Sequence, residues 1–274
     1  MLNRYLFIDQ NAAENLIHQS YNYKPIKTED SKTKAYYVKN YIVLHKTNIP
    51  VADSNTLPTE EYYYDVMLKL MKLYENKVSV VPILGYTINE NTIKTIDKGS
   101  DVYASGYVIL AKQRGDELYS YDKMPNPFSL ESTNYDSKKT NYLFSRLKEI
   151  SNIPQNHYDK YVSDFLKISK AGLKFDVYNQ SNILYNKTSG FIFSNINHKL
   201  QKFKTESEFN KSFIRNVFAV CCINFDYSQA LSATEKAELK ELNTIVYGKC
   251  LSSLVSLGFK TEEIEQGSIN IWKN

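Results

Sequence analysis

The chain has 274 residues, 42% of them hydrophobic and 23% charged, which is typical of a folded globular protein with a sizeable core. Its 34 basic and 30 acidic residues leave a net charge of +4, too balanced to indicate a nucleic-acid-binding protein. Only four basic residues are arginine, whereas 23 residues are tyrosine and asparagine is abundant. This bias is typical of an AT-rich genome, so the counts themselves carry no functional information.

The cysteines and the apolar runs indicate a cytoplasmic protein. Three cysteines are too few for a disulfide scaffold, and reduced, buried thiols are the expected state. Cysteine and histidine pairs at metal-binding spacing are absent from the sequence. The N-terminus lacks the apolar stretch of a signal peptide. Because the longest apolar run, Val217–Ile223, is far shorter than the roughly 20 residues of a membrane helix, no membrane insertion is expected.

The first part of the chain is predicted to form short strands around one helix. The expected strands are Tyr5–Ile8, Ala35–Val38, Tyr41–His45, Val78–Leu84 and Gly106–Ala111, all rich in β-branched or aromatic residues. The helix is predicted over Thr59–Glu75, with Pro58 near its first turn and acidic residues at its positive end. Its apolar residues recur at helical spacing, so one face is expected in the core.

The second part is predicted to be mainly helical, because no proline follows Pro154. The expected helices are Tyr158–Ala171, stopped by Gly172, and then Glu206–Phe218 and Ala233–Leu257. Between them, Ile183–Tyr185 and Phe191–Phe193 are predicted to pair as a hairpin. The expected fold is therefore α+β: a sheet-rich first lobe (1–111) with one helix, and a helical second lobe (112–274).

Residues 172–197 carry the motif that points to a chemistry. A helix ends at Gly172, a loop then presents Asp176 and Asn182, and Asn195 follows the hairpin. This arrangement (173–197) resembles the catalytic loop and metal-binding segment of protein kinases, in which an Asp orients the acceptor hydroxyl and oxygen ligands hold Mg²⁺. The resemblance implies a two-lobed protein-kinase-like fold, with Asp176 as a catalytic residue and Asn182 and Asn195 as metal ligands.

Other landmarks of that family fall in order along the chain. Val43-Leu44-His45-Lys46 resembles the strand that carries the phosphate-facing lysine, which implies a catalytic and ATP-binding role for Lys46, with Lys39 as the alternative. The helix 59–75 stands where the family has its C-helix, so Glu61 is expected to pair with that lysine, and Asp65 is the alternative. The stretch 107–119 resembles the fifth strand and the hinge, which places Ala111 and Gln113 at the cofactor.

The sequence also departs from the family. No glycine precedes Gly85, so the glycine-rich phosphate loop is missing, and 9–14 (Asp-Gln-Asn-Ala-Ala-Glu) is the candidate turn in its place. Asn195 stands where the family has the Asp of Asp-Phe-Gly. Asp176 lies six residues before Asn182 rather than five, and Lys-Phe precedes it instead of His-Arg.

Two hypotheses follow, both with ATP and Mg²⁺ or Mn²⁺ as expected cofactors. The first is an atypical ATP-dependent phosphotransferase of the Ser/Thr protein kinase type, with a protein substrate. The second is a pseudokinase, a non-catalytic module that binds a protein partner; a small-molecule kinase of the aminoglycoside or choline type is a weaker alternative. Each residue also has an ordinary interpretation: Asp176 as a solvated loop acid, Lys46 as a surface charge and Glu61 as a residue serving the helix dipole.

Overall fold

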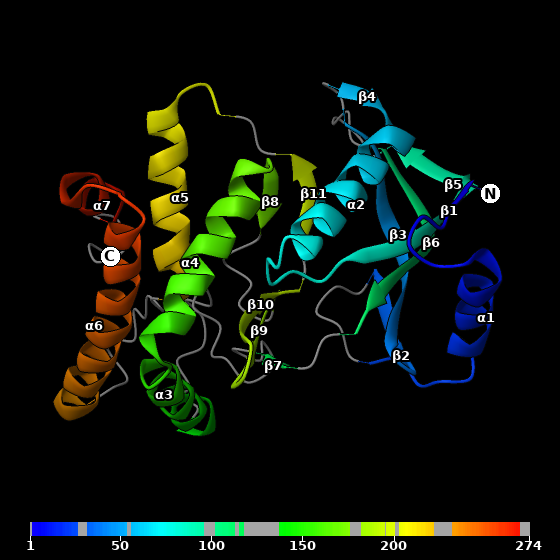
Figure 1. Ribbon diagram of the computed structural model, residues 1–274. Helices are drawn as coiled ribbons and strands as arrows, with labels where there is room; N and C mark the ends of the chain where they lie inside the picture. The colour runs from blue at the N-terminus through cyan, green and yellow to red at the C-terminus, as the bar shows by residue number, and fades with distance from the viewer. Residues whose placement is uncertain are drawn as a thin grey trace. The chain divides into compact units, whose positions relative to one another are not determined.

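The computed structural model describes residues 2–26, 32–53, 56–95, 102–112, 115–117, 137–175, 182–194, 196–200, 203–221 and 232–268. The chain divides into two compact units (Figure 1), an N-terminal unit, Met1–Arg114, and a C-terminal unit, Gly115–Asn274. The α+β class is confirmed, because an antiparallel sheet is followed by a largely helical part.

The N-terminal unit is built on a six-stranded antiparallel sheet. Its strands are β1 (Leu2–Arg4), β2 (Thr33–Val38), β3 (Tyr41–Asp53), β4 (Thr56–Pro58), β5 (Ile83–Thr95) and β6 (Val102–Ala111). They pair in the order β1-β5-β6-β3-β2, and β4 pairs with β3. β3 is an interior strand and is paired along residues 41–46 with both β2 and β6. β6 is rich in β-branched and aromatic residues, which favour strands.

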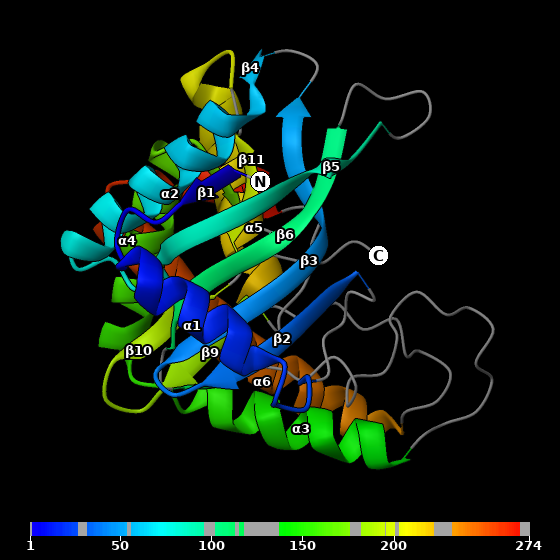
Figure 2. The same ribbon diagram turned by 90° about the vertical axis from the view of Figure 1, so that its right-hand side faces the viewer.

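Two helices cover opposite faces of this sheet (Figures 1 and 2). α2 (Thr59–Glu75) packs on β3 and β5, and α1 (Gln10–Ser20) packs on β2 and β3. The bounds predicted for α2 are confirmed, and its face of Val66, Met67 and Leu70 is buried as expected. Side chains alternate between the two faces of a strand, so residues next to one another in β3 serve different helices.

α1 is a correction to the sequence prediction, which placed a phosphate-binding turn at 9–14. Asp9 is the N-cap of this helix, and its carboxylate accepts a hydrogen bond from the backbone N–H of Ala12 at 3.0 Å. Ala13 and Leu16 are buried in a core shared with Val43 of β3. The predicted strand at Tyr5–Ile8 is also wrong, because the strand there is β1, which ends at Arg4.

Other strands have bounds that differ from the predicted ones, because backbone pairing continues beyond the residues with a strand-like sequence. β5 begins at Ile83 rather than Val78 and continues to Thr95, well past the predicted end at Leu84. β3 continues past His45 to Asp53, and β4 (Thr56–Pro58) directly precedes α2. Pairing with β6 satisfies backbone groups that a polar sequence would otherwise leave to water.

Helices dominate the C-terminal unit. They are α3 (Ser137–Ser151), α4 (Gln155–Lys170), α5 (Glu206–Cys221), α6 (Ala233–Ser256) and α7 (Thr261–Ser268). The predicted helices correspond to α4, α5 and α6, and the stop at Gly172 is confirmed by its positive φ of 77°. Within the described part of the chain, no helix combines the length and apolar character needed to cross a membrane.

Short strands surround the motif-bearing segment of this unit. The predicted hairpin is confirmed as β9 (Ile183–Asn186) paired with β10 (Gly190–Phe193), and β7 (Asp116–Glu117) adds to β9. A second pair joins β8 (Leu173–Phe175) to β11 (Ile196–Leu200). Aromatic side chains of α4 and the strands form the core beneath them, with Phe193 at its centre.

Candidate active site

Lys46 lies on β3 at a position paired on both sides. Its register partners are Thr33 on β2 and Gly106 on β6. Its neighbour His45 stacks on Tyr107, on the face covered by α1, so alternation places Lys46 on the opposite face, where α2 packs. The lysine is half-buried.

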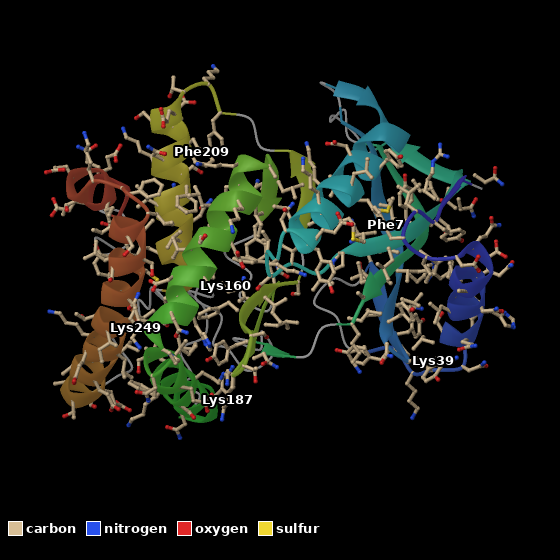
Figure 3. All side chains as sticks on the ribbon, viewed as in Figure 1. Phe7, Lys39, Lys160, Lys187, Phe209 and Lys249 are labelled. Atoms are coloured by element: carbon tan, nitrogen blue, oxygen red, sulfur yellow. The ribbon has the colours of Figure 1, made fainter. Side chains whose placement is uncertain are left out.

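Lys39, the alternative to Lys46, is not a strand residue. It sits in the turn between β2 and β3 with a positive φ of 56°. Figure 3 shows its side chain extending away from the end of that hairpin. The alternative assignment is therefore wrong, because a turn residue at the edge cannot occupy the strand position that the motif requires.

The two acidic candidates of α2 differ in what the structure shows. Glu61 is the third residue of the helix; its proposed pairing with Lys46 stays a prediction. Asp65 is ion-paired with Lys69 one turn further on, at 2.7 Å. Because this carboxylate already has a partner in its own helix, Asp65 is better explained as part of an i,i+4 pair.

Of the two hinge candidates, Ala111 ends β6 opposite Tyr41. Its backbone N–H donates to the carbonyl of Pro82 at 3.4 Å, and the next N–H, of Lys112, donates to Asn40 at 3.0 Å. The end of β6 is thus held by backbone bonds on both sides. Gln113 lies outside the described residues, as do Asp176 and Asn195.

Asn182 is buried at the start of β9, with 5% of its surface exposed. Its carbonyl accepts two hydrogen bonds from Ser194, one from the backbone N–H at 2.8 Å and one from the hydroxyl at 2.6 Å. Ser194 directly precedes Asn195 in the chain. The hairpin therefore closes with Asn182 bound to the residue next to Asn195.

The pairing of β8 with β11 involves the sequence neighbours of two further candidates, Asp176 and Asn195. Phe175 and Ile196 are register partners. Asp176 directly follows the first of these residues, and Asn195 directly precedes the second. The described pairings thus involve the sequence neighbours of Asp176 and Asn195, which themselves lie outside the described residues.

An open cavity of about 840 Å³ lies elsewhere in the C-terminal unit. It is lined by the end of α4, the start of α5 and the α6–α7 connection, including Leu166, Phe209 and Phe259. Lys46 and Asn182 are not part of its lining. Among the described residues, no group of three or more His, Cys, Asp or Glu side chains is placed to hold a metal ion.

A cluster of aromatic and titratable side chains on the α1 face was missed from the sequence. Tyr107 stacks on His45 with ring centroids 4.8 Å apart, and its hydroxyl is 2.5 Å from that of Tyr21. Burial raises the pKa of Tyr107, and the hydrogen bond with Tyr21 adds to the effect. The pairing of β3 with β6 would have shown that His45 and Tyr107 are opposite one another, but the sequence does not reveal that register.

His45 is expected to make the stability of the protein depend on pH. Burial, together with the nearby charge of Lys34, lowers the pKa of His45. At acidic pH the unfolded chain therefore binds a proton at His45 more readily than the folded chain does. The free energy of unfolding is expected to decrease as the pH drops through the range just below about 6.5. Replacing His45 with Phe keeps the stacking and is expected to flatten this dependence. Urea unfolding of both proteins from pH 7.5 to 5 measures it; equal slopes would contradict the prediction.

No protein-family model matches the sequence, and no curated protein matches it either. Solved structures similar to the chain include WbdD, ROP2 and the ROP18 kinase domain. The structure of WbdD is 10% identical, with a TM-score of 0.41 and 90% of this chain covered. The chain spans about half of WbdD, 50% in that structure and 51% in another described as a bifunctional kinase-methyltransferase.

Two further similar structures are those of ROP2 and of the ROP18 kinase domain. ROP2 from Toxoplasma gondii, described as a virulence factor with a protein-kinase fold and no enzymatic activity, is 10% identical with a TM-score of 0.41; 90% of this chain and 80% of that chain are covered. The ROP18 kinase domain in complex with AMP-PNP and sucrose is 11% identical with a TM-score of 0.36; 91% of this chain and 82% of that chain are covered.

Proposed function

We propose that this protein is a degenerate protein-kinase-like domain that binds ATP and transfers phosphate weakly or not at all. The observation that carries the proposal lies in the C-terminal unit, where the Phe175–Ile196 and Asn182–Ser194 pairings involve residues that include or adjoin Asp176, Asn182 and Asn195 in the sequence. A kinase needs a hydroxyl-orienting carboxylate and metal-binding oxygens from these places in the chain.

Lys46 supplies the matching element in the N-terminal unit. Its position on β3, paired with both β2 and β6, and the packing of α2 on β3 and β5 support a lysine that holds ATP phosphates, with Glu61 as its expected partner. Asp176 would accept the proton of an acceptor hydroxyl. ATP would supply the phosphoryl group for transfer to that hydroxyl.

Asn182 and Asn195 would be weak ligands for a divalent cation. Asn182 and Asn195 would offer neutral amide oxygens, whereas Mg²⁺ sites at phosphates generally include carboxylates. The helix α1 also occupies the stretch 9–14, the candidate for a phosphate-binding turn, so the backbone N–H groups of residues 12 and 13 are in a helical first turn. Both features support impaired catalysis, and the proposal is therefore a pseudokinase whose role is to bind a protein partner.

Thermal unfolding with ATP and Mg²⁺ or Mn²⁺ tests the proposal. A ligand that binds the folded state raises Tm with concentration, by a free energy of about 2.7 kcal/mol at 100 times Kd. We expect a shift at millimolar nucleotide that Lys46→Met removes. Lys39→Met is the matched control, since that lysine lies in an exposed turn, and it should leave the shift intact.

Three results separate the alternatives. No shift with wild-type protein would overturn the proposal. A shift accompanied by phosphate transfer that Asp176→Ala abolishes would identify an active phosphotransferase. A shift without transfer identifies the pseudokinase. In that case Asn195→Asp should increase the affinity for Mg²⁺ or Mn²⁺, because it restores a carboxylate.

A further inference from the structure

A cavity of about 300 Å³ lies on the α1 side of the N-terminal sheet. Its walls include three tyrosines, Tyr5, Tyr21 and Tyr107, and the carboxylate of Glu14. This is the face opposite Lys46, because His45 and Tyr107 lie on the α1 side and Lys46 alternates away from it. The cavity is therefore separate from the proposed nucleotide site, and the inference below does not depend on that proposal.

The aromatic walls are held in fixed orientations. The rings of Tyr21 and Tyr107 stand nearly perpendicular, at 86°, and are joined through their hydroxyls. His45 stacks behind Tyr107 at an interplanar angle of 19°, and because burial lowers the pKa of His45, this support is an uncharged ring. Tyr5 sits against Gly85, where a Cβ atom would be 2.8 Å from its Cδ1. The glycine makes room for the third ring.

The cavity has negative electrostatic character. Glu14 lies close enough to Tyr5 for its charge to contribute, after burial, to raising the pKa of that phenol. The carboxylate accepts a hydrogen bond from Gln10 at 2.9 Å, which leaves its charge in place. Neither lysine nor arginine is among the described residues that line the cavity; Ile17, His18 and Thr87 complete the lining.

We propose that this cavity binds a methylated ammonium group. The faces of tyrosine rings carry negative potential and attract cations within about 6 Å, and Glu14 adds a full negative charge at the rim. A quaternary ammonium is weakly hydrated and apolar on its outside, so it suits three rings and an isoleucine. A primary ammonium is strongly hydrated and would have to give up that water to pack against the rings.

Tetramethylammonium chloride is the direct probe, and tert-butanol is the uncharged molecule of similar shape. We expect saturable binding of tetramethylammonium in the millimolar range by NMR titration at pH 8, where imidazole groups are generally neutral. Amide signals of residues 14–21, 87 and 107 should shift. Binding of tert-butanol should be at least about tenfold weaker, because a cation–π site recognises charge. Sodium chloride at the same ionic strength is the salt control.

Two variants locate the site without disturbing the core. Glu14→Gln and Tyr21→Leu change exposed residues and should each weaken binding about five- to tenfold. Tyr23→Leu is the matched control, because Tyr23 is also exposed but does not line the cavity. Three results would each overturn the proposal: no detectable binding of tetramethylammonium in the millimolar range, equal binding of tert-butanol, or equal losses of affinity in Tyr21→Leu and Tyr23→Leu.

A second pair of probes identifies the source of the ligand. Free trimethyllysine and a short peptide that contains it carry the same charged group. If the peptide binds no more tightly than tetramethylammonium, the site takes a small molecule; if it binds at least tenfold more tightly, the site takes a methylated protein. A peptide with unmodified lysine should bind more weakly than the trimethylated peptide, and the reverse order would contradict the assignment.

Discussion

Replacing Gly106 with alanine is expected to destabilise the N-terminal unit by about 3 kcal/mol or more. A Cβ atom at this position would lie 1.9 Å from the carbonyl oxygen of Thr87 and 2.9 Å from Cδ1 of Ile49. The nearer atom belongs to the backbone of the paired strand β5, so it cannot move aside without opening the ladder between Gly106 and Ile88. Gly106 is also the register partner of Lys46, and the lysine should lose its fixed position.

Urea unfolding measures the loss, and Gly248→Ala is the control. Gly248 lies inside α6, and a Cβ atom there would meet nothing within 4 Å. Alanine is favoured over glycine in a helix by about 1 kcal/mol, so this variant should be more stable than the wild type. A free energy of unfolding for Gly106→Ala within about 1 kcal/mol of the wild-type value would contradict the prediction, because it would mean that β5 and β6 accommodate the added Cβ atom.

The second large effect is expected from Phe193→Ala, at about 3–5 kcal/mol. Phe193 is 1% exposed and lies at the centre of an aromatic cluster. Its ring stacks on Tyr161 and Phe165, with centroids 5.5 and 5.6 Å away, and meets Phe175 edge-on at 5.0 Å. Removing the ring leaves a cavity and separates β8 from β10, the two strands that lead to Asp176 and Asn195.

Phe193→Leu and Phe209→Ala are the control variants for this prediction. Leucine keeps most of the volume, so its cost should be a fraction of that of alanine. Phe209 is half-buried, and its truncation should cost less than that of Phe193. Chemical unfolding followed by circular dichroism reports all three, and a cost for Phe193→Ala no larger than that for Phe209→Ala would show that the cluster does not carry the core.

Elements with a strong local pattern were predictable from the sequence. α2 was found with its full bounds because Pro58, the acidic first turn and the apolar face agree with one another. The hairpin β9–β10 was found because β-branched and aromatic runs flank a glycine-containing turn. In both cases every local signal favours the same structure.

α1 shows how a resemblance can override a local signal. Asp9 as a cap and the spacing of Ala13 and Leu16 are typical of a helix start. A phosphate-binding turn was preferred because the kinase resemblance required one there. The extension of β5 to Thr95 could not be predicted, because its polar residues are held by pairing with β6 rather than by propensity.

For the candidate site, the sequence supplied residues but no strand register. Order and spacing selected Asp176, Asn182 and Asn195, whereas the pairings beside them, Phe175–Ile196 and Ile183–Phe193, depend on register. Register is set by packing of the aromatic core and by turn geometry, neither of which spacing alone reveals. The same limit hid the stacking of His45 on Tyr107.

The double pairing of β3 has a consequence for motion. Residues 41–46 are bonded to β2 on one side and β6 on the other, so their amide hydrogens can exchange with solvent only when the sheet itself opens. The turn at Lys39 and Asn40 has no such protection on both sides and should exchange far sooner. In hydrogen–deuterium exchange, Lys46 is therefore expected in the slowest-exchanging segment of its unit, only a few residues away from one of the fastest.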